Sequence, residues 1–263
     1  MDLHSITYLS SWSRINRRCP SVTSRTDLFG AALRSSYYSK KYARIRSLED
    51  VEPVAASAVF ARFREFENPH ASKPGPAQLA SPWTPDPRVA ALAPWFPMNV
   101  TLVLPDFHPA ELMAVAPEAL AAPIDTLRPL AALALQTGYS LPTLRFGAIA
   151  FTGVGRTVPT AADHDLLWQA FQVPLYTQFR GFHGELLASE CELHDGLHIH
   201  PTAADFEQTP AGLLVTSITN LRYPILRLNS GFHARIERQP CPCGLSTPRL
   251  QGLTTAEQPR AQN

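Results

Sequence analysis

Proline is concentrated in one stretch of this chain, and that stretch limits where regular structure can form. Proline makes up 25 of the 263 residues, about twice its usual share, and nine of the 25 lie between Pro69 and Pro105. A proline has no backbone N–H and a fixed φ, so it interrupts helices and sheet ladders alike. The sequence therefore predicts a Pro-rich connector over residues 67–97, between two segments with different hydrophobic patterns.

The segment before this connector has a helical pattern. Apolar residues recur at spacings of three and four in two stretches of residues 25–66, which is typical of helices with one buried face. We therefore expect residues 25–66 to form a helical segment. Residues 1–24 carry several arginines among serines but lack the apolar core of a secretory signal. We predict a flexible N-terminus there, either a targeting arm or a frayed start.

After the connector, strand-like and helical patterns alternate. The runs come in this order: a strand at 99–104, helices at 109–120 and 124–137, a strand at 144–151, a helix at 161–171, and strands at 173–179, 186–192, 197–200, 213–219, 225–228 and 233–237. This order is typical of an α/β fold. We predict an α/β core over residues 98–258 whose C-terminal half is rich in strands, followed by a tail at 259–263.

The balance of charges excludes two classes of partner. Lys and Arg together number 23 and Asp and Glu 22, which leaves a formal net charge of +1. No overall field therefore attracts the chain to nucleic acid or to an anionic membrane surface, and no apolar run approaches the ~20 residues that span a bilayer. Four cysteines in a chain of this length do not make a disulfide scaffold. We expect a cytoplasmic protein that binds neither nucleic acid nor membrane.

Four residues of the C-terminal half are of the types that bind zinc: Cys191, His198, Cys241 and Cys243. An Asp-Gly turn lies between the first two, and the run Cys-Pro-Cys-Gly brings the last two sulfurs close together. Three thiolates and one imidazole would fill a tetrahedral zinc and leave no open position, so the predicted site is structural. The alternative interpretation is that Cys191 is an ordinary buried strand residue and Cys-Pro-Cys-Gly an exposed turn.

Two more histidines, His194 and His200, lie in the same stretch. We interpret both as solvated turn residues, because only His198 lies between apolar neighbours just beyond the turn.

Four segments in the C-terminal part of the chain resemble a known family. They read ECELHDGLH (190–198), GLLVTSITN (212–220), YPILRLNSG (223–231) and CPCGLSTPR (241–249). In this order they resemble phenylacetate-CoA ligase-like proteins of the acyl-adenylate-forming (AMP-binding) superfamily, and roughly 110 C-terminal residues carry the likeness. Some members of that family hold zinc with a comparable Cys and His set. The resemblance implies part of the large domain of such an enzyme, a mixed sheet with flanking helices, ending in a zinc-clamped β region.

The resemblance also implies where remnants of a nucleotide site lie. Gly153-Val-Gly-Arg156 stands where the family has its adenine-binding loop, and residues 176–185 stand where it has an aromatic and acidic motif that helps hold magnesium. The predicted remnants of the substrate and nucleotide site are Gly153, Gly155, Arg156, Tyr176, Glu185 and Arg227.

Departures from the family pattern weigh against catalysis. The chain has no Ser/Thr/Gly-rich phosphate loop with a lysine, and Phe232 stands where the family has its ribose-binding aspartate. The sequence also ends before the family's mobile C-terminal domain. We therefore expect a degenerate ligase-like protein with no catalytic residues that binds a small carboxylate or acyl ligand, or a protein partner. The alternative is an ATP-dependent aryl- or acyl-CoA ligase that uses ATP, Mg²⁺ and CoA, forms an acyl-adenylate and then a thioester, and is completed by another subunit.

Overall fold

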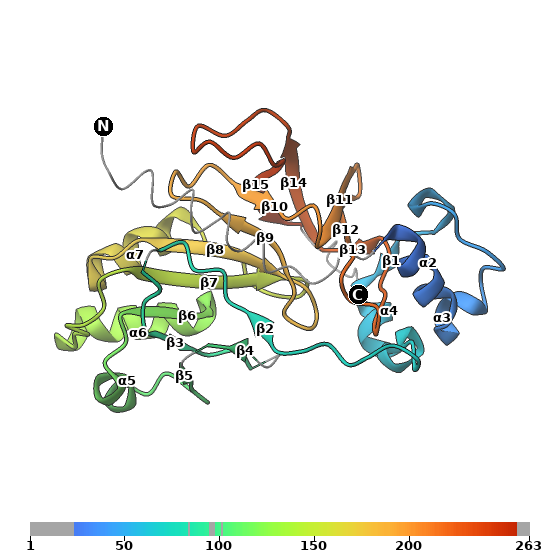
Figure 1. The fold of residues 1–263 in the computed structure, drawn as a ribbon. Coiled ribbons are helices and arrows are strands. Elements are labelled where there is room, and N and C mark those ends of the chain that lie inside the picture. The colour runs from blue at the N-terminus through green and yellow to red at the C-terminus, as the bar shows by residue number, and fades with distance from the viewer. Residues whose placement is uncertain (1–23, 84, 95–97, 101, 257–263) are drawn as a thin grey trace, which may run out of the picture.

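The structure is a computed structural model that describes residues 24–83, 85–94, 98–100 and 102–256 (Figure 1). Nearly all of the predicted flexible N-terminus and the whole of the predicted tail at 259–263 lie outside these residues. The described chain has the mixed α/β architecture predicted from the sequence, built around one large and two smaller sheets.

The large sheet is parallel in one half and antiparallel in the other. Its nine described strands have the order β14-β15-β10-β9-β8-β7-β6-β3-β5. The parallel half consists of β5 (Leu102–Val103), β3 (Val89–Ala91), β6 (Ala119–Pro123), β7 (Gly147–Gly153) and β8 (Leu175–Arg180). The antiparallel half consists of β9 (Leu186–Glu190), β10 (Leu197–Ile199), β15 (Arg249–Thr255) and β14 (Phe232–Glu237).

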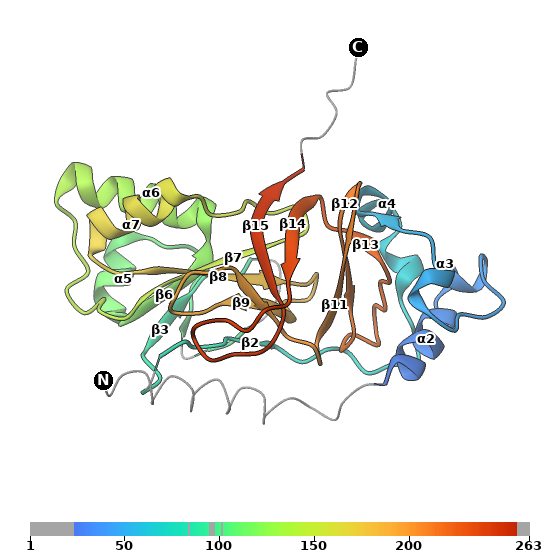
Figure 2. The same ribbon diagram turned by 90° about the horizontal axis from the view of Figure 1, so that it is seen from above.

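The parallel half is covered on both faces, which explains its unbroken runs of small apolar residues. Every residue of β6 and β7 is buried. One face packs against α5 (Pro109–Val115), α6 (Ile124–Thr137) and α7 (Ala161–Phe171) through an apolar cluster (Figures 1 and 2). The other face packs against a segment that holds the small parallel sheet of β2 (Ala77–Gln78) and β4 (Met98–Asn99).

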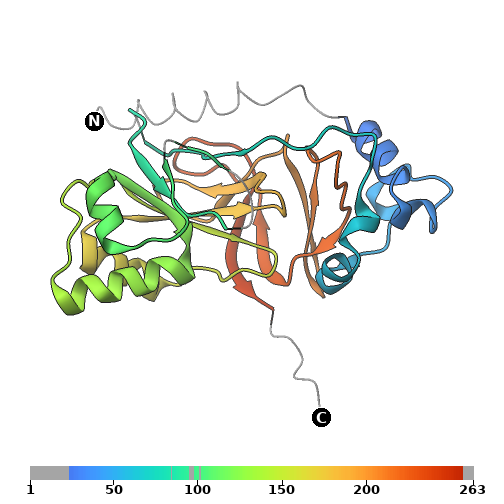
Figure 3. The same cartoon turned by 90° about the horizontal axis from the view of Figure 1, so that it is seen from below.

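A second sheet pairs a strand of the N-terminal segment with three strands of the C-terminal half. Its described strands are β1 (Val54–Ala55), β13 (Leu228–Asn229), β12 (Gly212–Ser217) and β11 (Ala204–Thr209), in that order. The N-terminal segment packs against this sheet with α2 (Arg25–Leu33), α3 (Ser36–Ser39), α4 (Ala56–Ala61) and the 3₁₀ turns Leu48–Asp50 and Phe63–Phe66 (Figure 3). The hydroxyl of the buried Tyr38 accepts a hydrogen bond from the Leu226 backbone N–H at 2.8 Å. One apolar core therefore contains residues from both ends of the described chain.

Two helices, α6 and α7, begin and end where the periodicity predicts. The helix predicted at 109–120 is shorter, because α5 ends at Val115 and Ala116 adopts a left-handed conformation with φ 47°. Pro117 follows, and a proline there prevents the helix from continuing. The alanine-rich residues that follow form the buried strand β6 instead. Their small side chains let helices pack closely on the sheet.

The Pro-rich connector, predicted to have no periodicity, contributes β3 to the large sheet, where it lies between β6 and β5. A strand of three residues fits between Pro87 and Pro94. The strands β11 and β15 were also not predicted. The residues of β11 are mostly polar and half-exposed, so the strand has no apolar pattern. The pattern of β15 is interrupted by a bulge at Gly252, where φ is +63°. None of the helices in the described residues is long and apolar enough to cross a membrane.

One partly buried ion pair ties α6 to α7. The Arg128 guanidinium donates to both carboxylate oxygens of Asp163, at 2.5 and 2.9 Å. The same carboxylate accepts hydrogen bonds from the backbone N–H and hydroxyl of Thr160, which caps the start of α7. Burial acts to raise the pKa of Asp163, but these hydrogen bonds outweigh burial and hold that pKa at about 2.

We expect Asp163→Asn to lower the free energy of unfolding by about 1–2 kcal/mol at pH 7, after allowance for solvent screening. Because the folded pKa lies below the ordinary value of 3.8, the carboxylate stabilises the fold above about pH 4. That contribution is lost as the pH falls toward 2. Urea unfolding from pH 2 to 7 measures the effect. Asp165→Asn, an exposed position of the same helix, is the control, and equal losses in both variants would contradict the assignment.

Candidate metal centre and strand-end crevice

The four predicted metal ligands lie together. The sulfurs of Cys191, Cys241 and Cys243 and one ring nitrogen of His198 are all within 4.8 Å of one another. The Cys191 and Cys241 sulfurs are 3.9 Å apart, and the Cys243 sulfur is 3.4 Å from His198 Nε2. Around a tetrahedral zinc with ordinary bond lengths, these separations would be about 3.8 and 3.6 Å. Within the described part of the chain, this is the one such group of Cys, His and acidic residues.

Two tight turns bring the ligands together. Cys191 directly follows β9, and His198 lies in β10, which pairs with β9 and β15. Between them Gly196 has φ +84°, and a Cβ there would lie 2.6 Å from the Leu250 carbonyl oxygen, so only glycine fits. The β14–β15 loop supplies the other two cysteines, and the Gly244 N–H donates to the Cys241 carbonyl at 2.9 Å.

The surroundings of His198 favour a neutral ring with Nε2 directed at the sulfurs. Its Nδ1 lies 3.0 Å from the Thr247 hydroxyl, and a backbone hydrogen bond to Thr247 adds to this contact. Burial, and then the charge of Arg249, lower the pKa of His198 to about 4. A neutral imidazole whose other nitrogen is held by a hydrogen bond is the form that binds metals.

The sulfurs are surrounded by groups that favour thiolates once a cation is bound. Burial raises the pKa of Cys191 and raises that of Cys243 to about 12, whereas hydrogen bonds from the backbone of Leu193 and Leu245 act to lower them. Arg249, which is buried, interacts with Cys241 and donates to Asp195. Three thiolates on a divalent ion leave a net charge of −1, so this guanidinium lies where a counter-charge is needed.

The other two histidines lie outside this group. His194 is partly exposed as predicted, stacks on Tyr176 and lies 3.2 Å from a Glu190 carboxylate oxygen. His200, predicted as a solvated turn residue, is instead buried and hydrogen-bonded to the Ser189 hydroxyl at 3.1 Å. It follows β10, whose backbone carries it into the interior. Burial lowers the pKa of His200 far below its usual range.

A second candidate site lies at the carboxyl ends of the parallel strands, where α/β folds bind their ligands. Gly153 at the end of β7 faces Arg180 at the end of β8, and a Cβ on Gly153 would lie only 2.2 Å from the Arg180 carbonyl oxygen. A side-chain nitrogen of Arg156 is 3.4 Å from the same point. Gly155 follows with φ +72°, and the Phe60 ring of α4 lies 3.5 Å from its Cβ position.

Glu185 completes this group, which we call the strand-end crevice. Its carboxylate accepts hydrogen bonds from the backbone N–H of His183, at 3.0 Å, and from the Asn220 side-chain amide. Burial lowers the pKa of Arg156 to about 10, and the charge of Glu185 acts in the opposite direction. Four of the six predicted remnants, Gly153, Gly155, Arg156 and Glu185, are therefore close together.

The structure places the other two remnants elsewhere. Tyr176 lies near the start of β8, four residues or roughly 13 Å from Arg180, where its ring contacts Trp83 and His194. Arg227 has φ +48°, and its guanidinium pairs with Glu207 at 3.0 Å and donates to the Val51 carbonyl at 2.8 Å. Arg227 therefore ties β13 to β11 and to the N-terminal segment.

Side chains fill the strand-end crevice. The cavity beside Arg180 and Glu185 has a volume of about 20 Å³, enough for one water molecule. Phe182 projects into this region and contacts Phe60 edge to face, with ring centroids 5.3 Å apart. Phe232, at the predicted ribose position, is buried against Phe179. Binding pockets for organic ligands usually measure at least ~300 Å³.

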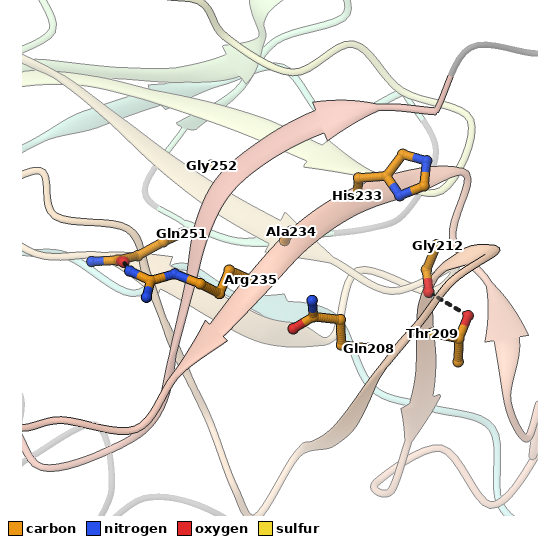
Figure 4. A pocket seen from close by; sticks show the side chains of 8 residues that line it. All are labelled: Gln208, Thr209, Gly212, His233, Ala234, Arg235, Gln251 and Gly252. Carbon is orange, nitrogen blue, oxygen red and sulfur yellow. Dashed lines mark hydrogen bonds between the residues drawn. The ribbon is translucent and has the colours of Figure 1, made fainter.

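A larger hollow of about 510 Å³ lies away from both sites. Figure 4 shows that it lies between the β11–β12 hairpin and the β14–β15 ribbon. Its one arginine, Arg235, is already paired with Glu237 at 3.2 Å and donates to Gln251. Most of its polar side chains therefore already bond to other groups of the protein.

Two important residues were missed by the sequence analysis. Arg180 directly follows the strand predicted at 173–179, and Arg249 lies at the end of the run CPCGLSTPR; neither had a predicted role. An arginine beside a cysteine pair is a signal that could have indicated Arg249. No sequence signal indicates that Arg180 is fully buried.

Comparison with known proteins gives structural matches only. No protein-family model and no curated protein matches the chain. In an open conformation with 2-HIB-AMP and CoA, 2-hydroxyisobutyryl-CoA ligase matches 64% of this chain at 17% identity, with a TM-score of 0.50. The same ligase in its thioesterification state gives the same three values. The R395G form of coronafacic acid ligase from Pectobacterium brasiliense is less similar, at 10% identity and a TM-score of 0.41 over 62% of this chain and 38% of that one.

The fold is therefore similar to that of part of 2-hydroxyisobutyryl-CoA ligase. The chain spans less than half of the matched ligase, 45% and 43% of its length in the two states. Identity of 17% establishes similarity of fold alone.

We expect one divalent metal ion per chain in protein purified without chelator. Cys191→Ser and His198→Ala should each lose it, because a tetrahedral site with three donors binds far more weakly. Elemental analysis of the purified chains measures the content. Cys19→Ser and His194→Ala are matched controls for each residue type and should keep the metal. Equal metal content in all four variants would contradict the assignment.

Removal of the metal should unfold at least the β14–β15 region. Metal binding to comparable structural sites contributes on the order of 10 kcal/mol to folding, and here the ion would join the turn after β9 to the β14–β15 loop. Hydrogen exchange with and without a strong chelator should show lost protection in β15 and β10 before α6 and α7. Unchanged exchange in a chain shown to have lost its metal would contradict this expectation.

Proposed function

We propose that this chain is a degenerate acyl-CoA ligase-like protein that does not form acyl-adenylates on its own. The observation that best supports this proposal is the size of the cavity in the strand-end crevice. Its volume of about 20 Å³ is far too small for a nucleotide. Four of the predicted remnants meet there, but aromatic and arginine side chains occupy the space. The function that remains is binding of a small carboxylate or acyl group, or of a protein partner.

The chemistry of the chain supports this proposal. Adenylate formation depends on groups that position ATP and stabilise charge on its phosphates. The sequence has no glycine-rich phosphate loop, and a phenyl ring at Phe232 cannot accept hydrogen bonds from ribose hydroxyls. The Glu185 carboxylate is already held by two internal donors. Few groups remain free to hold magnesium or phosphate.

The proposed metal is zinc, in a structural role. Cys191, His198, Cys241 and Cys243 would hold it in a closed site without an exchangeable position, so it would supply folding free energy and no Lewis-acid chemistry. The donor set of three thiols and one neutral imidazole supports zinc over harder ions, which prefer oxygen. Reduced thiols also support a location in the cytoplasm.

A second candidate is a phenylacetate-CoA ligase-type enzyme completed by another subunit. It is favoured by one observation, namely that the chain spans 45% of the matched ligase. A second chain could then supply the phosphate loop and the groups that bind ATP, Mg²⁺ and CoA. The aromatic side chains of the crevice would have to move apart on assembly.

Carboxylate-dependent ATP–pyrophosphate exchange separates these candidates. With phenylacetate, 2-hydroxyisobutyrate and a panel of related acids, we expect the isolated chain to exchange no faster than a reaction without protein. A complete acyl-CoA ligase under the same conditions is the positive control, and metal content shows that the tested chain is folded. Exchange that depends on one carboxylate in the isolated chain would overturn the proposal.

A further inference from the structure

Arg180 is the largest fully buried side chain of the described residues. Its guanidinium donates to the backbone carbonyls of Gln78, at 2.7 Å, and Gly184, at 3.0 Å, and to the side-chain oxygen of Gln178. The Phe151 ring lies 5.3 Å away. These groups are all neutral, so they satisfy hydrogen bonds without balancing the charge.

Within the described residues, Arg180 forms no ion pair with a carboxylate. The nearby Glu185 uses both oxygens to accept hydrogen bonds from His183 and Asn220. Burial, and then the charge of Arg156, lower the pKa of Arg180 to about 9, and the charge of Glu185 acts in the opposite direction. The groups to which Arg180 donates therefore leave its charge without a counter-ion in direct contact. A buried charge without a counter-ion is strongly destabilising, so such charges are nearly always compensated.

A small cavity adjoins this charge. It measures about 20 Å³ and is lined by Arg180, Ser217 and Asn220 among apolar residues. Arg180 Nε and the Ser217 hydroxyl are buried and have no hydrogen-bond partner among the described residues. Both are donors, and donors beside an uncompensated cation favour an anion over water. A volume this small admits only an occupant of about one to three heavy atoms.

We propose that this cavity binds a singly charged anion no larger than formate, held by Arg180 and Ser217. The shared chemistry is that of a halide or of the carboxylate of the smallest acids. This inference goes beyond the proposed function and does not depend on it, because an anion here would balance Arg180 whether or not the chain has any ligase activity.

Chloride binding to the metal-loaded chain tests the proposal. In a gluconate buffer of constant ionic strength, replacing gluconate by chloride should raise the melting temperature along a saturating curve, since a ligand of the native state stabilises it. Broadening of the ³⁵Cl NMR line should reveal binding directly. Formate and acetate arms distinguish the occupants: competition by formate but not acetate indicates the one-carbon limit, and chloride alone indicates a halide site.

Variants of the two donors identify the site. Arg180→Met should abolish chloride broadening and be at least as stable as the parent in gluconate, because an unpaired buried charge has been removed. Ser217→Ala should weaken binding about tenfold, and it provides the test if Arg180→Met fails to fold. The control, Arg235→Met, removes an exposed arginine and should leave binding unchanged. Non-saturating effects, or broadening that survives Ser217→Ala unchanged, would overturn the proposal.

Discussion

The reversal of strand direction between β8 and β9 is the constraint on which the rest of the structure depends. Up to β8 the large sheet is parallel and covered on both faces, and from β9 onward it is antiparallel. Register shifts next to Arg180 at this boundary, so the end of β8 is where ladder pairing becomes irregular. The crevice opens at that irregularity, while the metal ligands come from the turns that close the antiparallel half. The reversal of strand direction between β8 and β9 therefore determines the positions of both candidate sites in the fold.

The strand-end crevice lies where α/β folds bind their ligands, but it does not contain the open volume of a ligand pocket. A working pocket keeps its polar groups exposed to an open volume, whereas here polar groups bond to neighbouring parts of the protein. Glu185 bonds to its own loop and to Asn220, and aromatic side chains from α4 and from the loop after β8 pack over the opening. Such packing stabilises the fold because buried aromatic area contributes favourably. The same packing leaves a cavity of only about 20 Å³ beside Arg180.

How much of this could be predicted from the sequence differs between elements for physical reasons. The helices α6 and α7 follow from periodicity, and the metal group follows from the rarity of cysteines and their one-residue spacing. Short strands of alanine such as β3 and β6 carry no periodic signal, because alanine suits helices and buried strands equally. The position of Arg227 within a family-like run indicated a ligand role, yet its left-handed backbone turns the side chain toward Glu207. Burial of Arg180 depends on contacts with residues about a hundred positions away, which no local pattern contains.

Electrostatics connects the two sites through β10. His198 lies at the metal group, and His200, two residues later, is lowered in pKa first by burial and then by the charge of Arg180 and by His198. Alternate residues of a strand share a face, so this face runs from the sulfurs to the buried guanidinium. Neutral imidazoles along it add no charge to an interior that already holds Arg156, Arg180 and Arg249. In the two proposals above, negative charge is supplied at one end by thiols that release their protons to solvent when a metal binds. At the other end it is supplied by an anion beside Arg180.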